Sequence, residues 1–379
     1  MARLGDIATY INGYAFKPTD WSNEGVPIIR IQDLTGNSYQ ANRYNGKYDA
    51  KYEVNYGDVL ISWSASLGVY VWTGEKAVLN QHIFKVQFDK AEVDKNFFVH
   101  QVECILSNAS NEAHGATMKH LTKPVFDALP FYLPDIGKQK KIAEKLDKVS
   151  ILISLRKQQL SKLDELVKAR FVEMFGDPNS NSMGWNKARL SECLTSIDNG
   201  KSFVCDSEPR IGERPAVLKL SAATYGYYQP FENKAMLDDS QFVKCAEVHK
   251  GDLLFTRKNT PELVGMSAYV YETPPNLMMP DLIFRLNTRD NCNKVFLWKI
   301  INLDLFRTNV AALSSGSAKS MSNISKERLL GLEIILPPIE LQNDFATFVE
   351  QIDKSKSEIQ KSLEKLETLK KALMQKYFG

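Results

Sequence analysis

The chain has 379 residues, of which 44% are hydrophobic and 25% are charged, and its formal net charge is +3. This length predicts more than one domain, and this composition is that of folded globular chains rather than disordered ones. The sequence shows no apolar run of about 18 residues and no signal-peptide pattern, which predicts a cytoplasmic protein with no membrane partner.

The first third of the chain reads as a globular segment. Short β-branched and aromatic runs lie at 27–31, 58–63, 68–72 and 82–86, with turn residues between them, and a helical pattern lies near 95–107. Runs of this length bounded by turn residues are typical of strands. We expect a mixed α and β segment whose strands are mostly antiparallel.

Residues 138–175 contain no Pro or Gly and are rich in strong helix formers. Steps of four and three residues connect mostly apolar positions, as in the seam of a coiled coil. The predicted seam consists of Ile142, Leu146, Val149, Ile153, Arg156, Leu160, Leu163, Val167, Arg170 and Met174. A helix of this length would extend about 57 Å and needs a partner to bury its stripe.

The motifs of the first segment begin again after a polar, turn-rich linker at 177–184. LGDIATYINGYAF at 4–16 aligns with LSECLTSIDNGKSF at 190–203, and YGDVLIS at 56–62 aligns with KGDLLFT at 250–256. HIFKVQF at 82–88 aligns with LIFRLNT at 282–288. The period of about half the chain is too long for a solenoid and indicates a two-fold internal duplication. The second segment should therefore repeat the strands, at 215–220, 252–256, 267–271 and 282–286, and the helix, near 293–305.

A second rod occupies residues 340–378. Its predicted seam consists of Leu341, Phe345, Phe348, Ile352, Ser355, Ile359, Ser362, Leu366, Leu369, Leu373 and Lys376. A two-fold duplication reverses one rod relative to the other, so the two helices should pack antiparallel. The predicted fold is α+β, with two pseudo-symmetric globular domains separated by two long antiparallel coiled-coil helices. The expected boundaries are 1–134, 135–176, 177–337 and 338–379.

Motifs for catalysis are missing from the sequence. NGKS at 199–202 ends like a phosphate-binding loop, but Thr195 stands where that loop requires its first glycine. The chain has no (Asn/Asp)-Pro-Pro-aromatic tetrapeptide for amino-methyl transfer. Its five histidines and five cysteines show no metal-ligand spacing. These observations predict a chain with no catalytic residues, no metal and no cofactor of its own.

Polar, basic and aromatic residues follow the predicted strands and fill two loops, HGATMKHL at 114–121 and SGSAKSMS at 315–322. Arg and Lys suit phosphates and guanine edges, and Asn and Gln suit adenine edges. The candidate DNA-binding residues of the first segment are Arg30, Gln32, Ser62, Trp63, Ser64, Asn80, Gln81, Thr117 and Lys119. Those of the second are Lys219, Ser221, Thr256, Arg257, Lys258, Asp281, Ser317 and Lys319.

The order and duplication of these motifs resemble the specificity subunits of type I restriction–modification systems. The resemblance covers essentially the whole chain and rests on GDVLIS and GDLLFT, the two loops above, LPDIGKQKKIAEKLD, LPPIELQNDFATF and ARFVEMFGD. The first unit departs from the family where LPDIGKQ lacks the usual double proline and acidic-Gln pair; LPPIELQ is closer.

The resemblance implies that each globular unit is a target recognition domain for one half of a split, asymmetric sequence in double-stranded DNA. It also implies that the rods set the spacing and dock two modification subunits, which bind S-adenosylmethionine and methylate adenine. Restriction or motor subunits join the full complex and cut the DNA. The chain itself would then be a non-catalytic subunit.

Two other classes of function fit parts of the sequence. A coiled-coil scaffold that binds only protein partners would share the rods, although it would not need two differing polar loop faces. A single-chain methyltransferase would need the cofactor and catalytic motifs that this sequence lacks. Binding to heparin or DNA across a salt series separates the scaffold from a DNA-binding protein.

Overall fold

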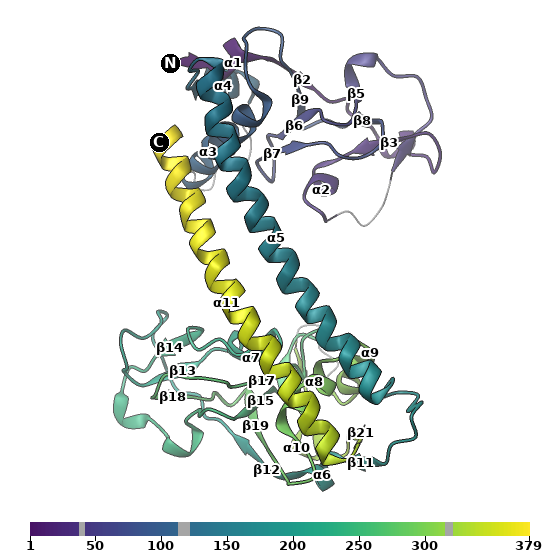
Figure 1. Cartoon of the computed structure of the whole chain (residues 1–379), viewed down its shortest axis with the longest axis vertical. Coiled ribbons are helices and arrows are strands. Elements are labelled where there is room, and N and C mark those ends of the chain that lie inside the picture. Colours follow the sequence, from purple (N-terminus) through teal and green to yellow (C-terminus); the bar gives the residue numbers. More distant parts are fainter. Residues whose placement is uncertain (38–41, 113–121, 315–320) are drawn as a thin grey trace. The chain divides into compact units, whose positions relative to one another are not determined.

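A computed structural model describes residues 1–37, 42–112, 122–314 and 321–379 (Figure 1). Two compact units emerge from the distribution of contacts. Unit 1 comprises Met1–Gln158 and Gln360–Gly379, and unit 2 comprises Gln159–Ile359. Each unit thus contains one globular part and one portion of each long helix, α5 (Ile136–Phe175) and α11 (Ile339–Phe378).

Unit 1 is built on a four-stranded antiparallel sheet of order β2-β9-β6-β7, formed by β2 (Thr9–Asn12), β9 (Ile83–Gln87), β6 (Val59–Ser62) and β7 (Gly68–Val71). A second sheet has the order β4-β3-β8-β5, formed by β4 (Arg43–Tyr44), β3 (Val26–Ile29), β8 (Ala77–Leu79) and β5 (Glu53–Val54). Within it, β3 and β8 are parallel. The remaining elements are β1 (Ala2–Arg3), β10 (Pro130–Phe131), α1 (Leu4–Ile7), α2 (Ile31–Leu34), α3 (Lys95–Glu112), α4 (Lys123–Ala128) and two 3-10 turns (Pro18–Asp20, Ala50–Tyr52).

Unit 2 repeats this plan. Its four-stranded antiparallel sheet has the order β12-β19-β15-β17, formed by β12 (Leu194–Asn199), β19 (Ile283–Thr288), β15 (Leu253–Thr256) and β17 (Ser267–Tyr269). The second sheet has the order β14-β13-β18, from β14 (Asn233–Ala235), β13 (Ala216–Leu218) and β18 (Leu277–Met278), with β13 and β18 parallel. The other strands are β11 (Lys187–Arg189), β21 (Glu333–Ile335), β16 (Lys258–Asn259) and β20 (Ser322–Asn323). The helices are α6 (Leu190–Cys193), α7 (Ser221–Thr224), α8 (Lys294–Asn302), α9 (Asp304–Ala312) and α10 (Lys326–Leu330), with 3-10 turns at Asp239–Gln241 and Lys244–Ala246.

The register of the strands confirms the duplication at the level of single residues. Phe84 of β9 lies opposite Asn12 and Ile61 in unit 1. Phe284 of β19 lies opposite Asn199 and Phe255 in unit 2. The predicted α+β class is therefore confirmed, and the parallel pair in each second sheet is the exception to the expected antiparallel pairing.

Aromatic side chains join the globular part of each unit to its portion of the long helices. In unit 2 the ring of Phe171 on α5 lies 5.5 Å from that of Phe345 on α11, and Phe175 lies 5.1 Å from Phe296 of α8. In unit 1 the core includes Ile142 of α5 and Met374 of α11. Burial of each such ring or branched side chain stabilises the folded state by about 1.5–3 kcal/mol. The portions of α5 and α11 are therefore part of the hydrophobic cores of the two units.

The long helices pack antiparallel, as predicted. In unit 2, Lys356 Nζ lies 2.5 Å from the Asp164 carboxylate, while Phe345, earlier on α11, meets Phe171, later on α5. Every predicted seam position of α5 is buried or half-buried. The two rods predicted at 138–175 and 340–378 are confirmed to within two residues at each end.

Eight of the eleven seam positions predicted for α11 are buried or half-buried, and the prediction is wrong at the other three. Ser355, Leu369 and Lys376 are exposed. The covered positions instead include Leu363, which is 5% exposed, whereas Leu369 is 46% exposed. Leu363 and Met374, which are buried, each stand one residue after a predicted seam position, so the covered stripe of α11 is shifted by one residue there.

Candidate nucleic-acid interface

Several strand ends of unit 1 meet at one place. The backbone amide of Trp63, after β6, donates to His82 O (3.2 Å), directly before β9. The amide of Asn80, after β8, donates to Ile29 O (3.1 Å), at the end of β3 and directly before Arg30. These bonds bring together a set of candidate residues that we call polar edge 1, consisting of Arg30, Trp63, Asn80 and Gln81.

Unit 2 has the equivalent arrangement. The amide of Arg257, after β15, donates to Leu282 O (3.0 Å), directly before β19. Lys219 follows β13, and Asp281 follows its parallel neighbour β18 by a short turn. We call this set polar edge 2, consisting of Lys219, Ser221, Arg257, Lys258 and Asp281.

Trp63 and Arg257 occupy the same position in the two units. The Trp63 ring stacks on Phe84, with centroids 5.7 Å apart and an interplanar angle of 22°. The Arg257 guanidinium lies over Phe284, 5.0 Å from the ring centroid. Both side chains also meet an asparagine: Trp63 Nε1 donates to Asn12 Oδ1 (3.1 Å), and Arg257 donates to Asn323 Oδ1 (3.3 Å). The same backbone position therefore presents a neutral ring in unit 1 and a cation in unit 2.

Two candidate residues are corrected by the structure. Ser62 and Thr256, at the ends of β6 and β15, have no exposed surface. Ser62 Oγ donates to Ser66 O within its hairpin, and Thr256 Oγ1 donates to Met266 O (3.0 Å) in the equivalent hairpin. Both hydroxyls hold a hairpin together and cannot reach a ligand. Ser64 is 5% exposed and offers little surface.

Other candidates are engaged with neighbouring side chains. Ser221 Oγ donates to Glu232 (2.7 Å), and Lys219 Nζ lies 3.9 Å from the same carboxylate. The Asp281 carboxylate is exposed and accepts a hydrogen bond from Ser202 Oγ. Arg30 is half-buried, with its guanidinium 5.4 Å from the Trp21 ring centroid.

Gln32 and Asn80 carry buried amide atoms, Nε2 and Oδ1 respectively, that have no hydrogen-bond partner among the residues the structure describes. Thr117, Lys119, Ser317 and Lys319 lie outside the described residues.

The sequence-based prediction missed four exposed polar residues at the same edges: Asn12 at the end of β2, Tyr14 after it, and Lys201 and Ser202 after β12. The signal that could have found them is the duplicated Asn-Gly at 12–13 and 199–200. A Cβ on Gly13 would lie 1.9 Å from Asn80 O, and one on Gly200 would lie 2.1 Å from Pro280 O. These glycines permit the backbone to pass the turn before β9 or β19, which accounts for NGKS without a phosphate.

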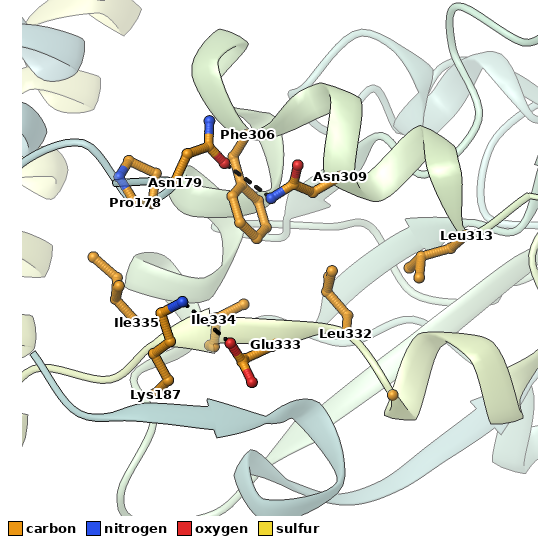
Figure 2. A pocket seen from close by; sticks show the side chains of 11 residues that line it. Pro178, Asn179, Lys187, Phe306, Asn309, Leu313, Leu332, Glu333, Ile334 and Ile335 are labelled. Atoms are coloured by element: carbon orange, nitrogen blue, oxygen red, sulfur yellow. Dashed lines mark hydrogen bonds and ion pairs between the residues drawn. The ribbon is translucent and has the colours of Figure 1, made fainter. Parts of the chain in front are cut away.

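Unit 2 has a pocket of about 520 Å³, whose lining side chains are shown in Figure 2. It is bordered by α9, β21 and the linker that follows α5. Lys187 Nζ lies 3.3 Å from Glu333, and Asn309 Nδ2 donates to Asn179 Oδ1 (2.9 Å). Among the residues that the structure describes, none of the DNA-binding candidates lines this pocket.

Two general properties complete the description. In the described ranges, no helix is long and apolar enough to cross a membrane. Across the same residues, the His, Cys, Asp and Glu side chains form no group of three or more with the geometry to hold a metal ion.

Comparison with known proteins gives the family. A family model described as "Type I restriction modification DNA specificity domain" matches residues 1–165 and 184–371. The EcoBI specificity subunit of Escherichia coli is 25% identical over 69% of this chain and 55% of its own length. The EcoEI specificity subunit of Escherichia coli is 30% identical over 55% of this chain and 36% of its own length. The matched region thus spans about half or less of these two relatives.

The fold has a solved counterpart. The crystal structure of the type I restriction–modification S subunit from M. genitalium aligns over 100% of this chain and 95% of that one, with 12% identity and a TM-score of 0.60. That likeness concerns the fold, and the family match concerns the sequence of both halves. The chain belongs to the family of type I restriction–modification DNA specificity proteins and carries the specificity domain twice.

Proposed function

We propose that this chain is the subunit that selects the DNA sequence in a type I restriction–modification complex. Each polar edge reads one half of a split site in double-stranded DNA, and α5 and α11 set the number of unread base pairs between the halves. The observation that carries this proposal is the repetition of one backbone arrangement with different side chains, above all Trp63 in place of Arg257. Two scaffolds of one design with different chemistry suit an asymmetric site.

The long helices also present apolar surface. Ile151, Leu152 and Leu155 of α5 are 58%, 44% and 48% exposed. Neighbouring apolar side chains left uncovered on a helix favour contact with another protein. In our proposal this surface helps to dock two modification subunits, and restriction or motor subunits complete the complex.

In the same proposal the chemistry belongs to the partners. The modification subunits bind S-adenosylmethionine and methylate the DNA, and this chain contributes sequence selection and geometry without catalysis. Arg257 and Lys258 supply cations suited to phosphates and guanine edges, and Asn80 and Gln81 supply amides suited to adenine edges.

The test is reconstitution with the cognate modification subunits, labelled S-adenosylmethionine and a library of randomised DNA duplexes. The expected result is methylation at a split, asymmetric sequence by the complex and none by the isolated chain. Methyl transfer by the isolated chain would overturn the non-catalytic role. A continuous recognised sequence would overturn the division between two units.

A further inference from the structure

Two exposed tyrosines lie in unit 2 next to polar edge 2. Tyr225 and Tyr227, directly after α7, are each 56% exposed. Tyrosine is enriched at binding interfaces, because its ring supplies apolar contact area and its hydroxyl group supplies a polar tip. Neither residue is among the DNA-binding candidates predicted from the sequence.

The residues that alternate with these tyrosines are held inward. Thr224 Oγ1 accepts from Asn259 Nδ2 (3.1 Å), and Gly226 O accepts from Trp298 Nε1 (2.9 Å). The hydroxyl groups of Tyr228 and Thr273 lie 2.8 Å apart, and burial raises the pKa of Tyr228 to about 12. Because every second residue is fixed to the body of the unit, Tyr225 and Tyr227 project outward from a fixed backbone.

Gly226 makes this alternation possible. Its φ of +84° lies in the left-handed region, which a residue with a side chain rarely adopts. A Cβ there would also point toward the side chains of Met266 and Asn302. The conformation of this turn therefore depends on the glycine between the two tyrosines. The exposure of Tyr225 and Tyr227 follows from that fixed conformation.

The loop adjoins polar edge 2 through two bonds. Asn259, which anchors Thr224, directly follows Arg257 and Lys258. Trp298 Nε1, which anchors Gly226, is also 3.2 Å from Ser267 O, and Ser267 pairs with Phe255 near the end of β15. The tyrosines and the cations of polar edge 2 thus adjoin the same end of the sheet.

We propose that Tyr225 and Tyr227 are DNA-contacting, specificity-determining residues of unit 2. This inference rests on the proposed function and extends polar edge 2 to the loop after α7. The rings are flat, lose little conformational entropy on binding, and suit the thymine methyl group, base edges and deoxyribose. Lys258 supplies the charge for the adjacent phosphate.

The experiment uses the assembled complex with two modification subunits and a randomised duplex library. The double variant Tyr225→Ala/Tyr227→Ala should bind its selected site about tenfold more weakly and lose preference at one or more positions of one half-site, while the other half-site and the gap stay unchanged. The Tyr225→Phe/Tyr227→Phe variant should keep most of the affinity if the ring faces make the contact. Leu237→Ser is the matched control, because Leu237 is 61% exposed in the same unit. Leu237 comes shortly after β14, beside the first residue of β13, whereas Lys219 follows the last residue of β13.

Photocrosslinking adds a direct readout that does not depend on a variant. Duplexes with 5-iododeoxyuridine in place of thymine in the selected site should crosslink to the peptide containing Tyr225 and Tyr227. Unchanged selection by the alanine variant, absence of that crosslink, or loss of subunit assembly in place of DNA selectivity would each overturn the inference. If the wild-type complex selects no split site at all, the proposed function fails instead.

Discussion

Gln139 and Gln342 form the same three hydrogen bonds in the two halves of the chain. Gln139 Oε1 accepts from Asp94 N (2.8 Å), while its Nε2 donates to Pro134 O (2.8 Å) and Glu92 O (3.4 Å). Gln342 Oε1 accepts from Asn293 N (2.9 Å), while its Nε2 donates to Pro337 O (2.7 Å) and Asn291 O (3.1 Å). Each amide ties the first turn of a long helix to the start of α3 or α8.

These shared hydrogen bonds explain why the loss of the second proline in LPDIGKQ leaves the connection between α5 and the start of α3 intact. The second proline of LPPIELQ is replaced by Asp135, whose Oδ1 accepts from the Lys138 amide (2.9 Å) at the start of α5. The glutamine, which carries the interaction, is present in both halves.

Replacing either glutamine by leucine should destabilise its unit by about 1–3 kcal/mol, because a buried backbone amide and two carbonyls lose their partner. Both glutamines are at most 1% exposed. Urea unfolding measures the effect, and Gln351→Leu, on the exposed face of α11, is the control. Equal stability of Gln139→Leu and Gln351→Leu would contradict the joint.

The corrected seam of α11 makes a second prediction. Leu363→Asp should lower the free energy of unfolding strongly, by about 3 kcal/mol or more, because it buries a carboxylate without a partner. Leu369→Asp should change it by no more than about 0.5 kcal/mol, because that side chain is exposed. Strict heptad stepping predicts the reverse order, so thermal or urea unfolding of the two variants separates the two descriptions.

Arg257→Ala should weaken DNA binding by the assembled complex by about 1–3 kcal/mol if the guanidinium contacts a guanine. The half-site read by unit 2 should lose preference at one position, and the other half-site should not change. Selection from a randomised duplex library measures both effects. A uniform loss of affinity over all sequences would show that Arg257 contacts phosphate only.

Exchange of residues 1–134 for the corresponding domain of a relative should change one half-site and leave the other half-site and the gap as they were. Methylome sequencing of a host that carries the hybrid and its modification subunit gives the answer directly. A hybrid that altered both half-sites together would contradict the division of labour between the units.

The lowered pKa of Lys299, on α8, predicts that the stability of unit 2 depends on pH. Burial lowers the pKa of Lys299 to about 8, with the Asp353 and Asp164 carboxylates opposing that shift and Lys356 adding to it. An unfolded lysine stays protonated to about pH 10.4, so between these values the unfolded state binds more protons and stability rises with pH.

The Lys299→Met variant should lose this rise. Relative to wild type, it should be stabilised by about 1–3 kcal/mol at pH 7 and by less at pH 10. Urea unfolding at both pH values measures the difference, and Lys354→Met, at an exposed position of α11, controls for general loss of a cation. If the difference in the free energy of unfolding between wild type and variant were the same at both pH values, the lowered pKa of Lys299 would be refuted.

The two rods and eight of the strands, β3, β6, β7 and β9 with their counterparts β13, β15, β17 and β19, were predictable because their signal is local. The rod bounds depend on a periodic apolar stripe and on the prolines before it, and the strands on short runs of β-branched and aromatic residues. The strands β2 and β12 were among those not predicted. Their sequences, TYIN and LTSIDN, contain few apolar residues and therefore do not show the pattern of a strand.

The direction of individual side chains was not predictable. Ser62 and Thr256 end apolar strands, and Trp63 and Arg257 come directly after them, yet the hairpin turns the first pair inward and the second pair toward the edge. The direction of each side chain depends on the pleat of the strand and on the strand that returns beside it, which belong to the tertiary structure. The outward direction of the two tyrosines after α7 also depends on tertiary contacts. Asn259 and Trp298 donate hydrogen bonds to the residues that alternate with them.

Phe84 and Phe284 each offer an aromatic face to the residue that follows the neighbouring strand. An indole and a guanidinium are both planar, and both stack on an aromatic face, the first as a ring pair and the second as a cation–π contact. The same aromatic face therefore accepts a neutral ring in unit 1 and a cation in unit 2. A single substitution there changes what the surface offers to a ligand from neutral to cationic, which lets binding preference diverge in small steps while the fold stays constant.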